Sequence, residues 1–132
     1  MAMAPLLGSC QRSSFQPDTI DQDYITFGKG GGMTNQVDTY YILRSGEVYR
    51  HNSLTKEYTP QEQLDKATRE ECFERALGLS DSLFGFEEPG NLYYFLTVHS
   101  DTVVRCTWGA QEFNPADSIL SFYQYAKEIT KN

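Results

Sequence analysis

The side chains most able to do chemistry are three cysteines, Cys10, Cys72 and Cys106, and two histidines, His51 and His99. A zinc site needs cysteine and histidine ligands at short, regular intervals, and these residues show no such spacing. A catalytic cysteine needs an exposed thiol beside an imidazole, whereas Cys72 and Cys106 fall on apolar faces of their expected elements. We therefore expect no metal site and two buried free thiols, with a disulfide between them as the alternative.

A second candidate for chemistry is the glycine-rich segment Gly28-Lys29-Gly30-Gly31-Gly32. A dinucleotide-binding loop has the pattern G-x-G-x-x-G between a strand and a helix, and a P-loop ends in Lys followed by Ser or Thr. Here a strand is expected to follow, so neither nucleotide motif is present and we expect no cofactor. The pattern predicts a loop or wide bulge that is flexible or contacts a partner, with an anion-binding nest of backbone N–H groups as the alternative.

The remaining titratable residues are typical of a solvated acidic surface. The chain has 18 Asp and Glu against 11 Lys and Arg, which gives a formal net charge of −7. Nucleic acids and anionic membranes attract clustered Lys and Arg, so neither is an expected partner. The sequence contains no G-x-S-x-G or H-E-x-x-H motif, and its adjacent carboxylates, such as Glu70-Glu71, are not arranged as a catalytic pair. We therefore expect a protein that is not an enzyme.

Several short strands are expected in the first half of the chain. The first strand is Tyr24–Phe27, and a hairpin then joins residues 37–44 to residues 47–51. A two-residue turn between these strands would place Leu43 opposite Val48.

The apolar pattern of residues 92–108 predicts a second hairpin with a three-residue loop. Its first half carries an apolar or aromatic residue at every second position. A two-residue loop would set these residues against the charged Arg105, whereas a three-residue loop sets them against Cys106 and Trp108. We therefore predict a loop at residues 100–102.

Two segments are expected to be helical. A capping-box pattern with Pro60 at the first helical position predicts one helix from Thr59 to Leu77, and a second helix is expected from Asn114 to Ile129. The order of elements is then strand, hairpin, helix, hairpin, helix. This order predicts an α+β fold, with one antiparallel sheet of about five strands and helices packed on one face.

Aromatic residues are more numerous than the core of so short a chain usually needs, with nine Tyr, eight Phe and one Trp. Tyrosines on outer strand faces fit either simple strand propensity or a partner-binding surface. The segment 80–91 is rich in turn formers and acids, yet its large apolar residues either close the end of the core or form a protruding contact. The candidate partner-binding residues are Gly30, Gly31, Gly32, Met33, Leu83, Phe84, Phe86, Tyr93 and Phe95.

The N-terminal residues indicate a lipoprotein leader. Leu7-Gly8-Ser9-Cys10 resembles the bacterial lipobox, in which the cysteine becomes the lipid-modified first residue of the mature protein. The basic and long apolar regions of a complete signal are lacking, so a chance cysteine is the alternative. Residues 11–23 are polar and have no sustained periodicity, as in a tether. We expect a leader and tether over residues 1–23, one globular domain over residues 24–132, and lipidation of Cys10.

Several motifs resemble those of a family of small uncharacterised lipoproteins of Bacteroidetes, over roughly residues 24–129. They are Phe27-Gly28 with Gly30-Gly31-Gly32, residues 40–48, Pro89-Gly90-Asn91 before Tyr93-Tyr94-Phe95, and Trp108-Gly109 with Pro115. This resemblance implies a location in the bacterial cell envelope, as an outer-membrane lipoprotein, and implies no activity. The layout of elements also resembles emfourin, a protein inhibitor of thermolysin-like metallopeptidases, but no inhibitory motif of that family is matched.

These observations lead us to expect a lipid-anchored, extracytoplasmic, non-enzymatic domain that binds a protein. A peptidase inhibitor or an immunity-type protein fits this description, with a secreted peptidase or a toxin as its partner. The alternative is an accessory or structural subunit of an outer-membrane complex that docks through Tyr93 and Phe95. A third hypothesis is a small-ligand binder or enzyme that uses the glycine loop.

Overall fold

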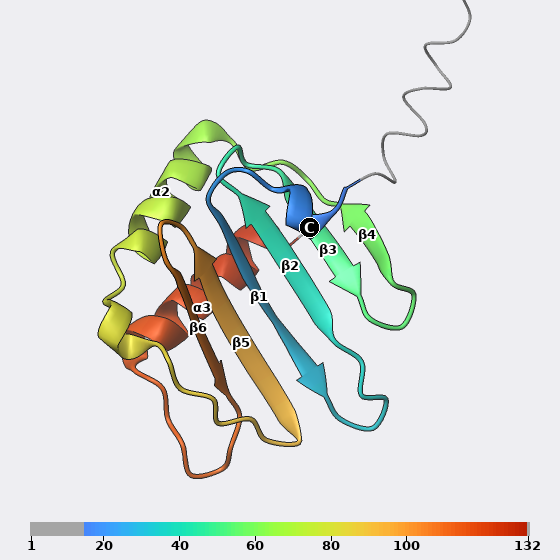
Figure 1. Cartoon of the computed structure of the whole chain (residues 1–132), viewed down its shortest axis with the longest axis vertical. Coiled ribbons are helices and arrows are strands. Elements are labelled where there is room, and N and C mark those ends of the chain that lie inside the picture. Colours follow the sequence, from blue (N-terminus) through green and yellow to red (C-terminus); the bar gives the residue numbers. More distant parts are fainter. Residues whose placement is uncertain (1–14, 132) are drawn as a thin grey trace, which may run out of the picture.

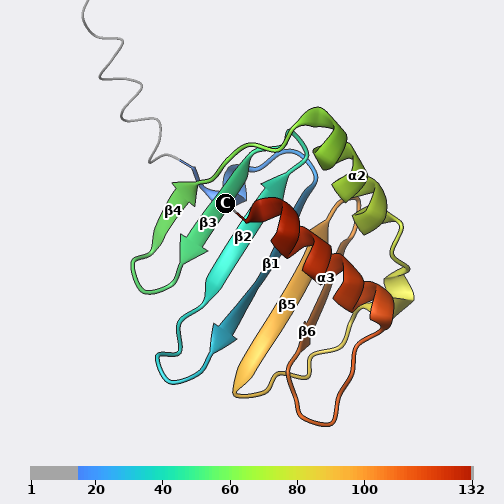
Figure 2. The same cartoon turned by 180° about the vertical axis from the view of Figure 1, so that it is seen from behind.

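The computed structural model describes residues 15–131, which form one antiparallel sheet with two helices on one face (Figures 1 and 2). The strands are β1 (Tyr24–Gly31), β2 (Asp38–Leu43), β3 (Val48–Asn52), β4 (Glu57–Pro60), β5 (Leu92–His99) and β6 (Val103–Trp108), in the spatial order β4-β3-β2-β1-β5-β6. The helices are α2 (Lys66–Leu77) and α3 (Asp117–Thr130), with short 3-10 turns η1 (Pro17–Thr19) and η2 (Asp81–Leu83). The predicted α+β class and order of elements are confirmed, and the sheet has six strands.

The core lies between the sheet and the two helices. Successive side chains of a strand point to opposite faces, so every second residue of each central strand faces the helices. Burying one large apolar side chain contributes about 1.5–3 kcal/mol, so this layer holds the helices to the sheet. The largest fully buried side chains are Phe27, Phe73, Phe122, Ile25, Ile42, Leu96, Ile119, Val48, Cys72 and Cys106.

Strand β1 continues through Gly28, Gly30 and Gly31, which the sequence predicted to lie in a loop, and only Gly32 lies in the turn that follows. Gly28 pairs with Phe95 and Gly30 with Tyr93 on the neighbouring strand β5. A Cβ atom at Gly28 would overlap the backbone oxygen of Asp38 and lie 2.9 Å from the Phe95 ring, and one at Gly30 would lie 2.6 Å from the Tyr93 hydroxyl. The loop prediction was wrong here because aromatic rings of β5 fill the surface that the glycines leave empty.

The first hairpin has a register one residue away from the predicted one. The Leu43 N–H donates to the Glu47 carbonyl at 2.9 Å, and the loop between them has three residues rather than two. Gly46 has a φ of +98°, which suits the last position of such a loop. Val48 therefore lies opposite Ile42, not Leu43, and both Val48 and Ile42 point into the core.

The first long helix starts later than predicted. Helix α2 begins at Lys66, and its N-cap is Asp65, whose Oδ1 accepts a hydrogen bond from the Thr68 N–H at 2.8 Å. The predicted N-cap, Thr59, lies instead in β4, which pairs with β3 and ends at Pro60. Proline is tolerated there because β4 is an edge strand, where a missing N–H breaks no ladder. The prediction of a helix from Thr59 was therefore wrong.

The C-terminal half follows the prediction closely. The second hairpin has the predicted three-residue loop at residues 100–102, and Leu96 lies opposite Cys106 as expected. Helix α3 begins at Asp117 rather than at Asn114, without a side-chain cap. No helix within residues 15–131 has the length and apolar character needed to cross a lipid bilayer.

Candidate functional site

The face of the sheet that no helix covers carries many aromatic side chains and is turned toward the viewer in Figure 1. An antiparallel sheet with one solvated face usually alternates apolar core residues with polar outer ones. Here large rings take many of the outer positions. We call this surface the open face; its members include Tyr24, Tyr41, Tyr49, Tyr58, Tyr93, Phe95, His99 and Arg105.

Part of the open face is covered by the chain that leads into β1. The Phe15 ring stacks on Tyr49 with 3.8 Å between ring centroids, and it meets Tyr41 and Tyr58 edge-on. The turn η1 follows on the same side of the sheet (Figure 1). Part of the segment expected to be a tether therefore packs against the β2 to β4 side of the open face.

A shallow groove of about 330 Å³ lies on the open face over β2, β1, β5 and β6, and Pro17 of η1 also lines it. Phe95 lies at its base and is only 5% exposed, with the Arg105 guanidinium carbon 5.4 Å from the ring centroid. His99 stacks on Tyr24 with 4.0 Å between centroids. Burial, and then the positive charge of Arg105, lowers the pKa of His99 below its usual 6.5. At neutral pH the groove therefore presents aromatic rings, one cation and an uncharged imidazole.

The structure brings six of the nine candidate residues to one region. Gly30 and Gly31 end β1 beside the start of β5, and Met33 lies fully exposed in the loop that follows. Tyr93 is half-buried across Gly30, and Phe95 forms the base of the groove. The exposed surface here is thus Met33 and Tyr93, since Phe95 is almost covered.

The other three candidates, Leu83, Phe84 and Phe86, lie apart, at the β6 edge of the sheet. All three are half-buried and pack against the core, and Phe86 meets Phe113 with 4.7 Å between ring centroids. Backbone hydrogen bonds tie the segment to β6, including one of 2.8 Å from the Gly85 N–H to a β6 carbonyl. These side chains close the end of the core, which was the alternative to a protruding contact.

Within the described residues 15–131, the cysteines and histidines are not grouped for catalysis or metal binding. Cys72 and Cys106 are free and fully buried, as predicted, and burial raises the pKa of each thiol to about 12. Both thiols therefore remain protonated at neutral pH and are poor nucleophiles. His51 packs on Tyr58, and within residues 15–131 no three His, Cys, Asp or Glu side chains are close enough to hold a metal ion. Cys10 lies outside the described residues.

Most of the open face was missed by reasoning from the sequence. Tyr24, Tyr41, His99 and Arg105 were not among the candidates, although each lies one position from a core residue in its strand. The signal that reveals them is aromatic or basic character at the outward positions of an alternating strand. That signal becomes specific only once strand order shows that these positions are neighbours.

No protein-family model matches the chain, and no curated protein matches its sequence. The resemblances to small Bacteroidetes lipoproteins and to emfourin therefore stay predictions.

Proposed function

We propose that this chain is a non-enzymatic protein-binding domain of the bacterial cell envelope that contacts its partner through the open face. The observation that carries the proposal is the cluster of tyrosines, His99 and Arg105 on the sheet face opposite α2 and α3. Tyr and Arg are enriched at the centres of protein interfaces, because they combine large contact area with hydrogen-bonding groups. The strands hold these side chains on a rigid base, which lowers the entropic cost of binding.

Two exposed apolar residues lie at the end of the sheet where β1 meets β5. Met33 lies in the loop after β1, and Leu92 shares the helix side of β5 with Tyr94 and Leu96, so it is not part of the open face. Met33 is fully exposed and Leu92 is 55% exposed, and a Cβ atom on the adjacent Gly32 would lie 3.1 Å from the Leu92 side chain. We include only Met33, in the loop that follows β1, in the proposed contact.

The lipid anchor proposed at Cys10 bears on the kind of partner. Five residue steps separate Cys10 from Phe15, and they span at most about 17 Å. Phe15 packs on the open face, so a lipid on Cys10 would hold that face near the bilayer. This geometry favours a membrane-associated partner, and thus the accessory subunit of an outer-membrane complex, over a freely diffusing peptidase or toxin.

Affinity capture with matched charge-reversal variants tests the proposal. The full chain is used as bait in envelope and secreted fractions of the native host, beside Arg105→Glu on the open face and Lys66→Glu on α2. Both substitutions change the net charge equally, and both positions are exposed. We expect Arg105→Glu to lose the partner and Lys66→Glu to retain it. Capture that is equal with all three baits would exclude the open face as the contact.

The membrane anchor and the class of partner are tested separately. Growth with a labelled fatty acid is expected to label the full chain and not the Cys10→Ser variant. A partner retained as part of a membrane assembly supports the accessory-subunit function, whereas a single secreted peptidase or toxin supports the inhibitor or immunity function.

A further inference from the structure

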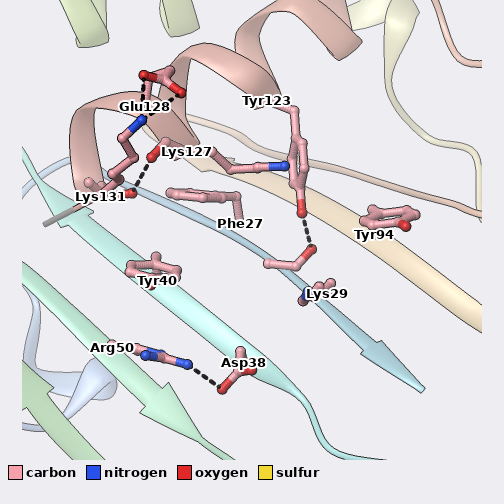
Figure 3. A pocket seen from close by; sticks show the side chains of 12 residues that line it. Phe27, Lys29, Asp38, Tyr40, Arg50, Tyr94, Tyr123, Lys127, Glu128 and Lys131 are labelled. Carbon is pink, nitrogen blue, oxygen red and sulfur yellow. Dashed lines mark hydrogen bonds and ion pairs between the residues drawn. The ribbon is translucent and has the colours of Figure 1, made fainter. Parts of the chain in front are cut away.

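A pocket lies on the helix side of the sheet, away from the open face. Helix α3 runs obliquely across the sheet and ends at Thr130, so it leaves part of the β2 and β3 surface uncovered (Figure 2). A cavity of about 450 Å³ opens between the C-terminal half of α3 and strands β1, β2, β3 and β5 (Figure 3). This volume lies within the range of about 300–1,000 Å³ that is typical of small-molecule sites.

The pocket is positively charged although the chain as a whole is acidic. Four basic and two acidic side chains line it, which is an excess of two positive charges in a chain with a net charge of −7. The basic residues come from β1, β3, α3 and the residue that follows α3, so the sheet and the helix end both contribute. The charged residues of the pocket are Lys29, Arg50, Lys127, Lys131, Asp38 and Glu128.

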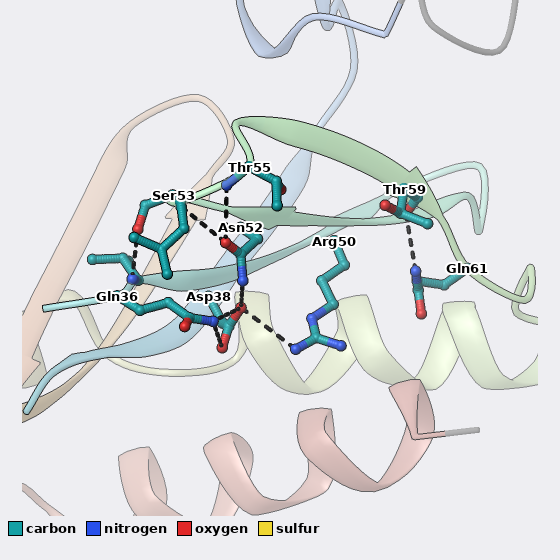
Figure 4. Close-up of polar contacts among 10 residues, drawn as sticks. Gln36, Asp38, Arg50, Asn52, Ser53, Thr55, Thr59 and Gln61 are labelled. Carbon is teal, nitrogen blue, oxygen red and sulfur yellow. Dashed lines mark hydrogen bonds and ion pairs between the residues drawn. The ribbon is translucent and has the colours of Figure 1, made fainter. Parts of the chain in front are cut away.

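Two of the four cations already have carboxylate partners. The Arg50 Nη2 atom lies 3.4 Å from Asp38 Oδ1, and Asn52 donates to the same oxygen at 3.1 Å (Figure 4). The Lys131 Nζ atom lies 3.3 Å from Glu128 Oε1 (Figure 3). Arg50 and Lys131 therefore help to shape the pocket, but their charges are largely balanced.

The other two cations, Lys29 and Lys127, have no such partner. Neither side chain forms a hydrogen bond or an ion pair with another residue of the described part of the chain, 15–131. The Lys127 Nζ atom lies 5.6 Å from the centroid of the Tyr123 ring, and Lys29 projects from β1 on the sheet side of the pocket. One ammonium group thus comes from the helix and the other from the sheet, which suits a shared anionic group.

Flat aromatic surfaces form the rest of the pocket wall. The Tyr40 ring is partly exposed and stacks on the buried Phe27 ring, with 5.3 Å between centroids and 12° between planes. Tyr94 meets Tyr123 at a centroid distance of 5.9 Å. The buried Tyr123 hydroxyl donates to the Gly28 carbonyl at 3.0 Å, so this wall is fixed to β1. Preformed flat walls of this kind bind planar apolar groups by stacking.

We propose that this pocket binds a small organic anion with a planar apolar body. The body packs against Tyr40 and Tyr94, and a carboxylate or similar oxyanion lies between Lys29 and Lys127. An inorganic ion would use the two ammonium groups and leave the aromatic wall unused, while a neutral ring would leave both charges without a partner. The pocket and the open face lie on opposite sides of the sheet, so this site is independent of the proposed protein contact.

Titration of the isotope-labelled full chain with 2-naphthoate, followed by amide NMR shifts, tests the proposal. We expect saturable shifts confined to the end of β1, the β2–β3 strands, β5 around Tyr94 and the C-terminal half of α3. Two comparison compounds separate the contribution of ring stacking from that of the negative charge. 2-Naphthalenemethanol has the rings without the charge, and acetate has the charge without the rings. Both are expected to bind at least about fivefold more weakly than 2-naphthoate.

Single substitutions then locate the anion. Lys29→Gln and Lys127→Gln each remove one ammonium group from an exposed position, and each is expected to weaken 2-naphthoate about fivefold. Lys66→Gln, at an exposed position on α2, is the matched control and should leave the affinity for 2-naphthoate unchanged. Equal binding of the neutral alcohol, shifts on the open face instead, no saturable binding, or equal affinities in all variants would each overturn the proposal.

Discussion

Replacing Gly28 by alanine tests whether the glycine-rich stretch is part of the sheet or a flexible loop. Gly28 lies in β1 between two paired strands, opposite Thr39 on β2 and Phe95 on β5. An added methyl group would overlap the Asp38 backbone oxygen and lie 2.9 Å from the tip of the Phe95 ring. The Asp38 carbonyl belongs to the backbone and cannot rotate away as a side chain can, so β1 and β2 must separate locally.

The expected loss of stability follows from these contacts. Separation affects the last two pairs of the β1–β2 ladder, Gly28 with Thr39 and Lys29 with Asp38. Each lost hydrogen bond removes about 1 kcal/mol, and overpacking against the Phe95 ring costs about 1–3 kcal/mol. Alanine regains up to about 1 kcal/mol through its smaller backbone entropy. We therefore expect Gly28→Ala to lower the free energy of unfolding by about 2–4 kcal/mol.

Urea unfolding, followed by circular dichroism and by the fluorescence of the buried Trp108, measures this change. The control is Gly78→Ala at the end of α2, where φ is −81° and the added methyl group would lie 3.1 Å from the Glu74 carbonyl oxygen, a much milder contact than at Gly28; its effect should stay below about 1 kcal/mol. A loss below about 1 kcal/mol for Gly28→Ala would refute the close approach of the strands. The stretch would then behave as the loop that its composition predicts.

Three further substitutions test other parts of the account. Tyr123→Phe removes the only hydroxyl bond between α3 and β1 found in residues 15–131 and should cost about 1–2 kcal/mol in urea unfolding, whereas Tyr125→Phe, without a hydroxyl partner there, should change little. Asp65→Ala removes the N-cap of α2 and should lower the free energy of unfolding by about 1 kcal/mol. Thr59→Ala, at the N-cap predicted from the sequence, should lower it by less than about 0.5 kcal/mol. A larger loss for Thr59→Ala than for Asp65→Ala would support the predicted helix start instead. Because burial lowers the pKa of His99 in the folded state, the unfolded chain binds a proton at a higher pH, about 6.5, than the folded chain does. The free energy of unfolding should therefore fall as the pH goes from about 7.5 to about 5.5, and His99→Gln should flatten this slope. An unchanged slope in His99→Gln would contradict the lowered pKa of His99.

Prediction from the sequence was most accurate for elements whose apolar pattern fits only one arrangement of strands and loop. The second hairpin is such a case, because only a three-residue loop puts Cys106 and Trp108 on the apolar face. The first hairpin has apolar residues on both faces, with Ile42 beside Leu43, so its pattern does not choose between two registers one residue apart. The slip of one residue in the prediction follows from that ambiguity.

Other features depended on partners far along the chain. The glycines of β1 form a strand because Tyr93 and Phe95, more than sixty positions later, cover them. The capping box at Thr59 is locally favourable, but pairing of β4 with β3 outweighs it. The candidate sites followed the same rule: sequence reasoning found Tyr93 and Met33, but not the groove or the basic pocket, which exist only once the strands are placed.

Site-specific photocrosslinking in living cells of the native host tests the proposed open-face contact most directly. A photoreactive amino acid placed at Arg105 reports on the open face, and one at Gln124 reports on the exposed side of α3. We expect a discrete protein adduct from position 105 and none from position 124. An adduct from position 124 alone, or equal adducts from both positions, would contradict the proposal that this domain binds its partner through the open face.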